Sequence, residues 1–239
     1  MTKQVLLLLP GLLCDETVWT HQRSALSAIA DTVVPDYASL DSIGAMAEKV
    51  LREAPSQTFA LAGHSMGGRV ALEVVRKAPE RVTRLALLDT GFEPIAVGEA
   101  GEQERAKRMN LLDTAKTRGM RAMGQQWAPG MVHPDRVATP VFDEILAMIK
   151  RRTPAEFEAQ ITALLGRPDA GPVLSLLRCP TRLICGRQDA WSPYARHEVM
   201  QQMIPVPWSR LSAVEDCGHM STMERPDAVS ALLAQWLLQ

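Results

Sequence analysis

Short apolar runs alternate with longer stretches of helical period, and this alternation limits the possible folds more than any other feature of the chain. The expected strands are Val5–Leu9, Thr32–Val34, Phe59–Ala62, Leu85–Leu88, Thr181–Cys185 and Trp208–Ala213. The expected helices are Trp19–Ile29, Ser42–Glu53, Met66–Lys77, one that starts near Pro193, and Pro226–Leu238. Such alternation is typical of right-handed βαβ units. It predicts an α/β fold with a mostly parallel sheet of about six strands and helices on both faces.

The segment from Phe92 to about Asp169 interrupts this alternation. It shows no strand signal, and its composition shifts toward Glu, Arg, Met and Ala at helical spacing, with prolines between the helical stretches. We therefore expect a core formed by residues 1–91 and 170–239, and an all-helical insertion at 92–169.

Ser65 lies in the sequence Gly63-His64-Ser65-Met66-Gly67-Gly68, between an expected strand and an expected helix. A G-x-S-x-G pattern in this context predicts a nucleophile elbow. Glycines are needed there because a side chain two residues before or after the serine would collide with the neighbouring strand or helix. Ser65 is therefore the expected nucleophile, with a helix N-terminus behind it that favours negative charge.

A nucleophilic serine needs a base and an acid that orients the base. Asp189 follows the strand Thr181–Cys185, and His219 follows the strand Trp208–Ala213. Because the carboxyl ends of parallel strands meet at one edge of a sheet, both side chains are expected beside the serine. Asp89 also follows a strand, but a strand-end aspartate beside a threonine is more often a turn or cap residue, so Asp189 is favoured as the acid.

An oxyanion hole requires two backbone amides near the nucleophile. One is expected to be that of Met66, the residue after Ser65. The other is expected from the loop after the first strand, where Leu12 is favoured because Gly11 lets the backbone turn toward a bound carbonyl.

With these motifs the chain resembles the α/β-hydrolases. The resemblance is carried by Leu6-Leu7-Leu8-Leu9-Pro10-Gly11, Gly63-His64-Ser65-Met66-Gly67-Gly68, Leu87-Leu88-Asp89-Thr90, Gly186-Arg187-Gln188-Asp189, Gly218-His219-Met220 and Glu224-Arg225-Pro226. It implies an α/β-hydrolase fold in which the helical insertion forms a cap. The chain departs from the family in two places. Pro10-Gly11 stands where the family commonly has His-Gly, and the first strand comes too early for the family's two N-terminal antiparallel strands.

Three further residues are candidates for substrate contact. His64 is expected either in the packed interior or against the substrate. Arg69 lies about one helical turn after Ser65, so it can face the site or an acidic residue, and a structural ion pair is the favoured interpretation. Gly67-Gly68-Arg69 also resembles the elbow of a menaquinone-pathway lyase of this fold, in which an arginine at this place helps to bind a carboxylated substrate. Trp127 and the methionines of the insertion are expected to pack between its helices, with a few over the pocket.

The other histidines and the cysteines favour structural interpretations. His21, His133 and His197 are expected on solvated helix or loop surfaces. The cysteines lack the spacing of a zinc site and are expected as free thiols in the core. They are Cys14, Cys179, Cys185 and Cys217. No metal or cofactor is expected.

The charge balance bears on the possible partners. The 26 Lys and Arg residues against 27 Asp and Glu leave no basic excess for nucleic acid. The apolar run Val5–Leu9 lacks a cleavage site after it and is too short to cross a membrane. We expect a cytoplasmic protein with a small-molecule substrate and no membrane partner, and the sequence leaves its oligomeric state open.

These residues together predict a serine hydrolase of a small ester, thioester or lactone. Two alternatives stay open. The same triad can abstract a proton in a lyase that acts on a carboxylated substrate, and the scaffold can serve as a non-catalytic binder of a small molecule.

Overall fold

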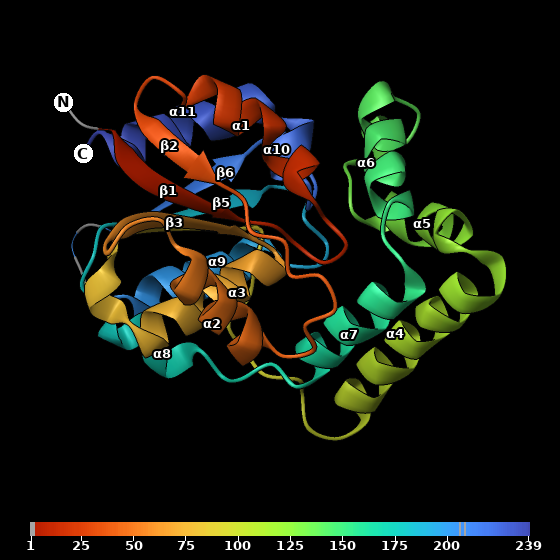
Figure 1. The fold of residues 1–239 in the computed structure, drawn as a ribbon. Coiled ribbons are helices and arrows are strands. Elements are labelled where there is room, and N and C mark those ends of the chain that lie inside the picture. Colours follow the sequence, from red (N-terminus) through yellow and green to blue (C-terminus); the bar gives the residue numbers. More distant parts are fainter. Residues whose placement is uncertain (1–2, 206, 208) are drawn as a thin grey trace.

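One fully parallel six-stranded sheet forms the centre of the computed structural model, which describes residues 3–205, 207 and 209–239 (Figure 1). The strands are β1 (Gln4–Leu9), β2 (Ala30–Val33), β3 (Phe59–His64), β4 (Val82–Leu88), β5 (Thr181–Gly186) and β6 (Arg210–Val214). Their order across the sheet is β2-β1-β3-β4-β5-β6. The chain changes direction across the sheet between β1 and β3. Open α/β sheets bind ligands at such a switch point.

Helices cover both faces of this sheet, which explains why its inner strands are apolar on both sides. Every residue of β3 and β5 is buried, whereas the edge strands β2 and β6 are partly exposed. Figure 1 shows α2, α3, α8 and α9 on one face and α1, α10 and α11 on the other. These core helices are α1 (Thr20–Ala25), α2 (Ile43–Glu53), α3 (Met66–Lys77), α8 (Gly171–Leu176), α9 (Tyr194–Met203), α10 (Ser221–Glu224) and α11 (Pro226–Leu237). Two 3-10 turns, η1 (Glu16–Trp19) and η2 (Pro79–Arg81), join them to their neighbours.

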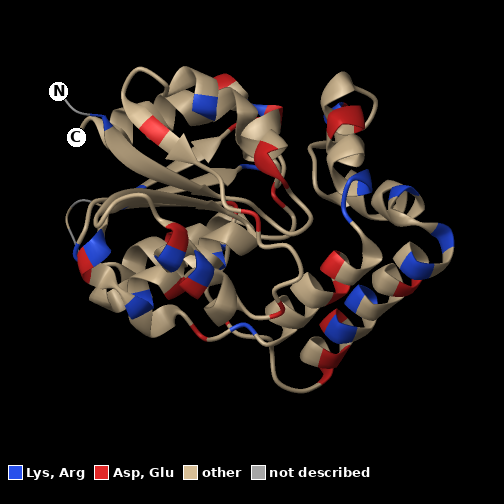
Figure 2. Ribbon diagram, in the orientation of Figure 1, with Lys and Arg blue, Asp and Glu red and all other residues tan. Residues whose placement is uncertain are grey.

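The segment 92–169, all of which is described, contains helices and no strand. Its elements are α4 (Glu99–Arg118), α5 (Met120–Trp127), η3 (Ala128–Gly130), η4 (Pro134–Arg136), α6 (Pro140–Lys150) and α7 (Pro154–Leu165). Gly119, with φ +85°, separates α4 from α5, and Thr153 caps α7 through a capping box with Glu156. Acidic and basic residues intermix along α4 (Figure 2). We call this segment the cap. The division of the chain into a core and a cap at residues 92 and 169 remains a prediction.

The expected strands and helices agree with the observed ones to within a few residues, apart from one region. The predicted helix Trp19–Ile29 is shorter in the structure, because residues 26–29 form turns that lead into β2. That strand begins at Ala30, ahead of the predicted Thr32, because Ala30 pairs with Gln4 of β1. The predicted start of the last strand at Trp208 lies outside the described residues. Within them, none of the helices combines the length and apolar composition that crossing a membrane requires.

Candidate active site

Ser65 occupies a sharp turn between β3 and α3. Its backbone has φ +53° and ψ −117°, which is strained for a residue with a side chain. The turn is tight enough that a Cβ added to Gly63 would lie 2.3 Å from the Gly67 carbonyl oxygen, and one on Gly67 would lie 2.2 Å from that of Leu9. The flanking glycines therefore allow the helix and the β1 strand to approach the serine.

Ser65, His219 and Asp189 form one chain of hydrogen bonds. The Ser65 Oγ lies 2.8 Å from His219 Nε2, and His219 Nδ1 lies 2.8 Å from Asp189 Oδ2. The other oxygen of Asp189 accepts the backbone N–H groups of Trp191 and Ser192 at 2.8 and 2.9 Å. This arrangement holds the imidazole in an orientation that lets Nε2 accept the serine proton.

The charges around the imidazole favour its protonated form. Burial lowers the pKa of His219, but Asp189, Asp89 and Glu224 outweigh burial and raise that pKa above its ordinary value. Burial opposes the charge of Asp189, yet His219 and the two amides bring its pKa below the ordinary value. Asp189 therefore stays ionised and stabilises the imidazolium that proton transfer would create.

The amides of Leu12 and Met66 are both free to receive a ligand, since neither donates a hydrogen bond to another described residue. Both residues line the cavity beside Ser65. The expected role of Gly11 is wrong in one respect, because the left-handed backbone of this loop falls on Leu13 (φ +59°). Gly11 serves close packing instead, as a Cβ there would lie 3.0 Å from His64 Nδ1 and 3.2 Å from Ser65 Cβ.

His64 is buried behind the nucleophile. Burial and the charge of His219 lower the pKa of His64 to about 3, so its ring is neutral. A neutral ring with a proton on Nε2 donates to the His219 backbone carbonyl across 2.8 Å. His64 also borders the cavity. Its position fits support of the catalytic histidine more closely than direct contact with a substrate.

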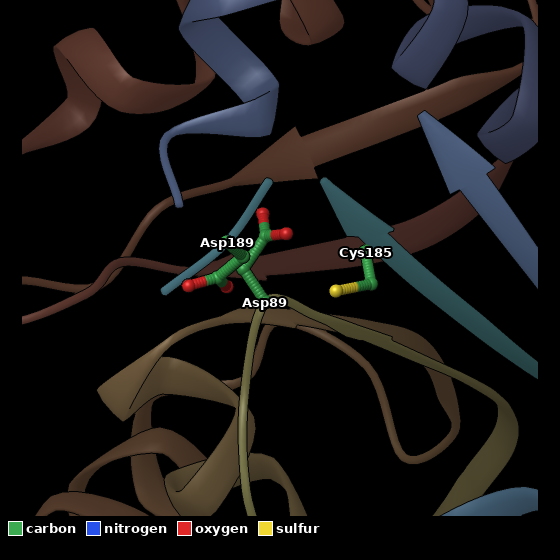
Figure 3. Close-up of side chains that lie close together, drawn as sticks. All are labelled: Asp89, Cys185 and Asp189. Carbon is green, nitrogen blue, oxygen red and sulfur yellow. The ribbon is translucent and has the colours of Figure 1, made fainter. Parts of the chain in front are cut away.

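Asp89 and Cys185 lie close to the triad residue Asp189, and one carboxylate oxygen or sulfur atom of each of the three lies within 4.8 Å of the others (Figure 3). Hydrogen bonds already occupy these atoms. Asp89 accepts from the Gly186 amide and from the Ser221 hydroxyl, and burial raises the pKa of the Cys185 thiol, which keeps it protonated. The chemistry of this group is that of a packed polar core and not of a metal centre. The expectation that Asp89 is a turn or cap residue is too limited, because its side chain is fully buried.

A cavity of about 600 Å³ lies over Ser65 and His219, and residues of both the core and the cap line it. Trp127 of α5 stacks on Trp191, with ring centroids 5.2 Å apart and an interplanar angle of 23°. Trp191 in turn lies 5.1 Å from the His219 ring. Trp127 therefore lines the cavity, while a role in binding substrate stays a prediction, and Trp191 is a cavity residue that the sequence did not suggest. Its place two residues after Asp189 is the signal that could have identified it.

Arg69 faces this cavity, and the ion pair favoured for it is wrong. No carboxylate of the described residues lies within 4.0 Å of its guanidinium, and its Nη1 donates to the backbone carbonyl of Glu93 at 2.8 Å. Arg196 converges on the same place, because a Cβ on Gly91 would lie 2.9 Å from Arg69 Nη2 and 3.1 Å from Arg196 Cδ. Burial and repulsion from Arg167 and Arg196 lower the pKa of Arg69 to about 9, so it still carries its charge at neutral pH.

Basic side chains line one wall of the cavity, and acidic residues neutralise their charge only in part. We call these residues the basic wall. Glu104 accepts two hydrogen bonds from Arg167, at 2.7 and 2.8 Å, and also pairs with Arg108. Glu93 pairs with Arg196 at 3.0 Å. With Arg69 and Lys107 also on the cavity wall, five cationic side chains face two carboxylates. The wall therefore carries an excess of three positive charges, which the sequence did not predict because its members come from distant segments.

The structure also corrects the expectation for His197, which is buried and not solvated. Its Nε2 accepts the Thr90 amide at 3.2 Å, and burial lowers its pKa to about 4. The residue is buried because α9 packs its His197 side against β5 and β6. Among the other histidines, His21 is exposed and His133 is partly buried.

Comparisons with known proteins agree with this architecture. The sequence profile of the group described as "Alpha/beta hydrolase family" matches residues 6–232. A 2-hydroxy-6-oxononadienedioate/2-hydroxy-6-oxononatrienedioate hydrolase of Escherichia coli K12 is 24% identical over 226 residues, which cover 87% of this chain and 72% of that protein. A thermophilic esterase from Thermogutta terrifontis, solved with malate bound, superposes with a TM-score of 0.89 at 27% identity, covering 99% of this chain and 90% of that one. The enol-lactonase of Burkholderia xenovorans LB400 shares the fold, with a TM-score of 0.87 at 19% identity over 100% and 93% of the two chains.

Proposed function

The chain belongs to the alpha/beta hydrolase family, and from this premise we propose that it is a serine hydrolase of a small ester, thioester or lactone. The observation that carries the proposal is the hydrogen-bonded chain of Ser65, His219 and Asp189 at the floor of a cavity. Leu12 and Met66, whose amides are free to bind a ligand, also line this cavity. Hydrolase activity is common to the relatives described above.

In the proposed reaction Ser65 Oγ attacks the substrate carbonyl while His219 Nε2 takes the serine proton. Asp189 holds the imidazole and stabilises its charge. The amides of Leu12 and Met66 donate to the oxyanion of the tetrahedral intermediate. His219 then protonates the leaving group and activates a water molecule that hydrolyses the acyl-enzyme. This sequence needs no metal or organic cofactor.

A fluorophosphonate probe tests the nucleophile, and a panel of p-nitrophenyl esters tests the reaction. We expect the probe to label Ser65 and the panel to be hydrolysed. Labelling without ester hydrolysis would favour a lyase. Absence of labelling would favour a non-catalytic binder.

The pH dependence of kcat/KM should report His219. The imidazole acts as a base only when neutral, so activity is lost as the pH falls through its pKa. Because that pKa is raised above the ordinary 6.5, the midpoint of the acidic limb is expected above pH 6.5. The check is a pH profile of the wild type beside His21→Gln, which alters an exposed histidine that does not line the cavity. A wild-type midpoint below 6.5 would contradict the assignment.

The basic wall of the cavity supports a substrate that carries a free carboxylate. No carboxylate of the described residues pairs with Arg69, and a partly buried guanidinium at a cavity wall gains most from a bidentate carboxylate. Two relatives support the same chemistry, since one is named for hydrolysis of a dioate, which is a dicarboxylate, and the other is solved with malate, also a dicarboxylate. Arg69 also lies about 6 Å along the α3 axis from Ser65. A carboxylate held there would be separated from the reacting carbonyl by a short linker.

Substitution Arg69→Ala is expected to separate acidic from neutral substrates. For monomethyl glutarate, kcat/KM should fall at least about thirtyfold, the equivalent of about 2 kcal/mol for a lost charged pair. For the uncharged analogue in which a carboxamide replaces the acid, we expect a change of no more than about threefold. Arg121→Ala, which removes an exposed arginine of α5, is the matched control. Equal losses of kcat/KM on both substrates would show that Arg69 supports the structure and does not bind the substrate's carboxylate.

The same cluster of arginines favours one second candidate, a lyase in which His219 abstracts a proton from a carboxylated substrate. The two reactions differ in the fate of Ser65. A hydrolase forms an acyl-Ser65 intermediate that rapid quenching and mass spectrometry detect, whereas an elimination leaves the serine unmodified.

A further inference from the structure

The Glu224 carboxylate is buried without a cation and receives backbone N–H groups from two separate parts of the chain. Its oxygens accept the Gly218 amide at 3.1 Å and the Met220 amide at 3.1 Å, on either side of His219. They also accept the amide of His133, in the cap, at 2.7 Å. The residue is 7% exposed, and no Lys or Arg nitrogen of the described residues lies within 4.0 Å of its carboxylate. Three N–H donors therefore supply the stabilisation that a buried carboxylate requires.

The cap and the histidine loop also touch directly at this point. The His219 amide donates to the Met131 carbonyl at 2.7 Å. A Cβ on Gly218 would lie 2.6 Å from the backbone of Val132 and of His133, so the two backbones are in contact. Together with the bond from His64 to the His219 carbonyl, these contacts fix the backbone of the catalytic histidine on both sides.

We propose that Glu224 is a positioning residue that couples the cap to the catalytic histidine. By accepting the His133 amide of the cap and the Gly218 and Met220 amides of the histidine loop on one carboxylate, it keeps His219 within reach of Ser65 while the cap is seated over the cavity. This inference rests on the proposed catalysis by His219. It implies that residues 131–133 stay attached to the core while substrate enters the cavity.

Glu224→Gln tests the coupling, because its amide keeps the shape but can present only one acceptor oxygen to the three donors. We expect kcat to fall at least about tenfold, because small misplacements of a catalytic group are costly, while KM changes by less than about threefold. The exposed residue Glu215, in the same loop region, provides the control variant Glu215→Gln, which should match the wild type.

The pH profile separates positioning from general destabilisation. The titratable groups that face His219 are Asp189, Asp89 and Glu224, with the neutral ring of His64 beside them, and burial raises the pKa of Asp89 to about 8. Loss of the Glu224 charge should move the acidic limb of kcat/KM to lower pH, since this charge helps to raise the His219 pKa. A purely structural role would lower the unfolding temperature without moving that limb.

A second pair of variants isolates the cap side of the contact. His133→Pro removes the one backbone N–H that the cap gives to Glu224, and the φ of −56° at this position suits proline. His133→Ala keeps the N–H and removes the ring. We expect a severalfold lower kcat in His133→Pro than in His133→Ala, and this comparison decides the matter if Glu224→Gln does not fold.

Two results would overturn the coupling. One is wild-type kcat and an unmoved acidic limb in folded Glu224→Gln. The other is equal kcat in the two His133 variants. Failure of the proposed catalysis itself would give a different result. The variant Ser65→Ala, with Glu224 and His133 unchanged, would then retain activity.

Discussion

Ser65→Ala and His219→Ala are each expected to abolish ester hydrolysis almost completely, with kcat lowered roughly a millionfold. The two side chains act as a unit across one 2.8 Å hydrogen bond, so loss of either removes the activated nucleophile. For the same reason the double variant should be no worse than the single ones. Asp189→Asn should cost less, on the order of ten thousandfold, since it leaves both reacting groups in place.

The measurement is kcat on an ester that the panel identifies, with folding checked by circular dichroism. Ser175→Ala, at an exposed serine of α8, is the control and should match the wild type. If Ser65→Ala kept more than about a tenth of the activity, another nucleophile would have to perform the reaction.

Gly67→Ala is expected to be the most destabilising methyl addition in the elbow. The new Cβ would lie 2.2 Å from the Leu9 carbonyl oxygen and 2.7 Å from that of Pro10, which are backbone atoms of β1 and its loop. They cannot turn away as a flexible side chain can, so α3 and β1 must separate. We expect the free energy of unfolding to fall by at least about 3 kcal/mol, the upper part of the range for overpacking. Urea unfolding of the two proteins provides the measurement.

Gly44→Ala is the matched control for this substitution. Gly44 lies in α2, and the nearest atom to an added Cβ is Glu73 Oε1 at 3.9 Å, an ordinary contact. Because alanine favours a helix over glycine, stability should rise by up to about 1 kcal/mol. Equal behaviour of the two variants would mean that the close approach at Gly67 does not constrain the fold.

The parallel sheet could be predicted because its signals are local. Each inner strand contains a short apolar run, and the glycines around Ser65 follow from the sterics of one turn. The order of Ser65, Asp189 and His219 then placed all three at strand ends, and the structure joins them in one hydrogen-bonded chain. Their catalytic roles stay a prediction.

The environments of Arg69, His197 and Glu224 could not be predicted, because each depends on contacts between distant segments. The carbonyl that Arg69 binds belongs to Glu93, after β4, and the other arginines come from the cap and from α9. The sequence around His197 looks like a polar helix, and its burial follows from how α9 meets the sheet. Glu224 lies in the motif Glu224-Arg225-Pro226, but its partner in the cap, the His133 amide, lies about 90 residues earlier.

The stack of Trp127 on Trp191 gives the molecule an intrinsic optical probe. One indole belongs to the cap and the other to the loop of the core that holds Asp189, so their separation follows any displacement of one lobe from the other. Indoles at this spacing couple their strong far-ultraviolet transitions, which produces a paired band of opposite signs in circular dichroism that isolated chromophores lack. The imidazole ring beside Trp191 quenches indole emission when it is protonated. Spectroscopy of the unmodified chain can therefore follow both a displacement of the cap from the core and the charge on His219, without a dye or an added label.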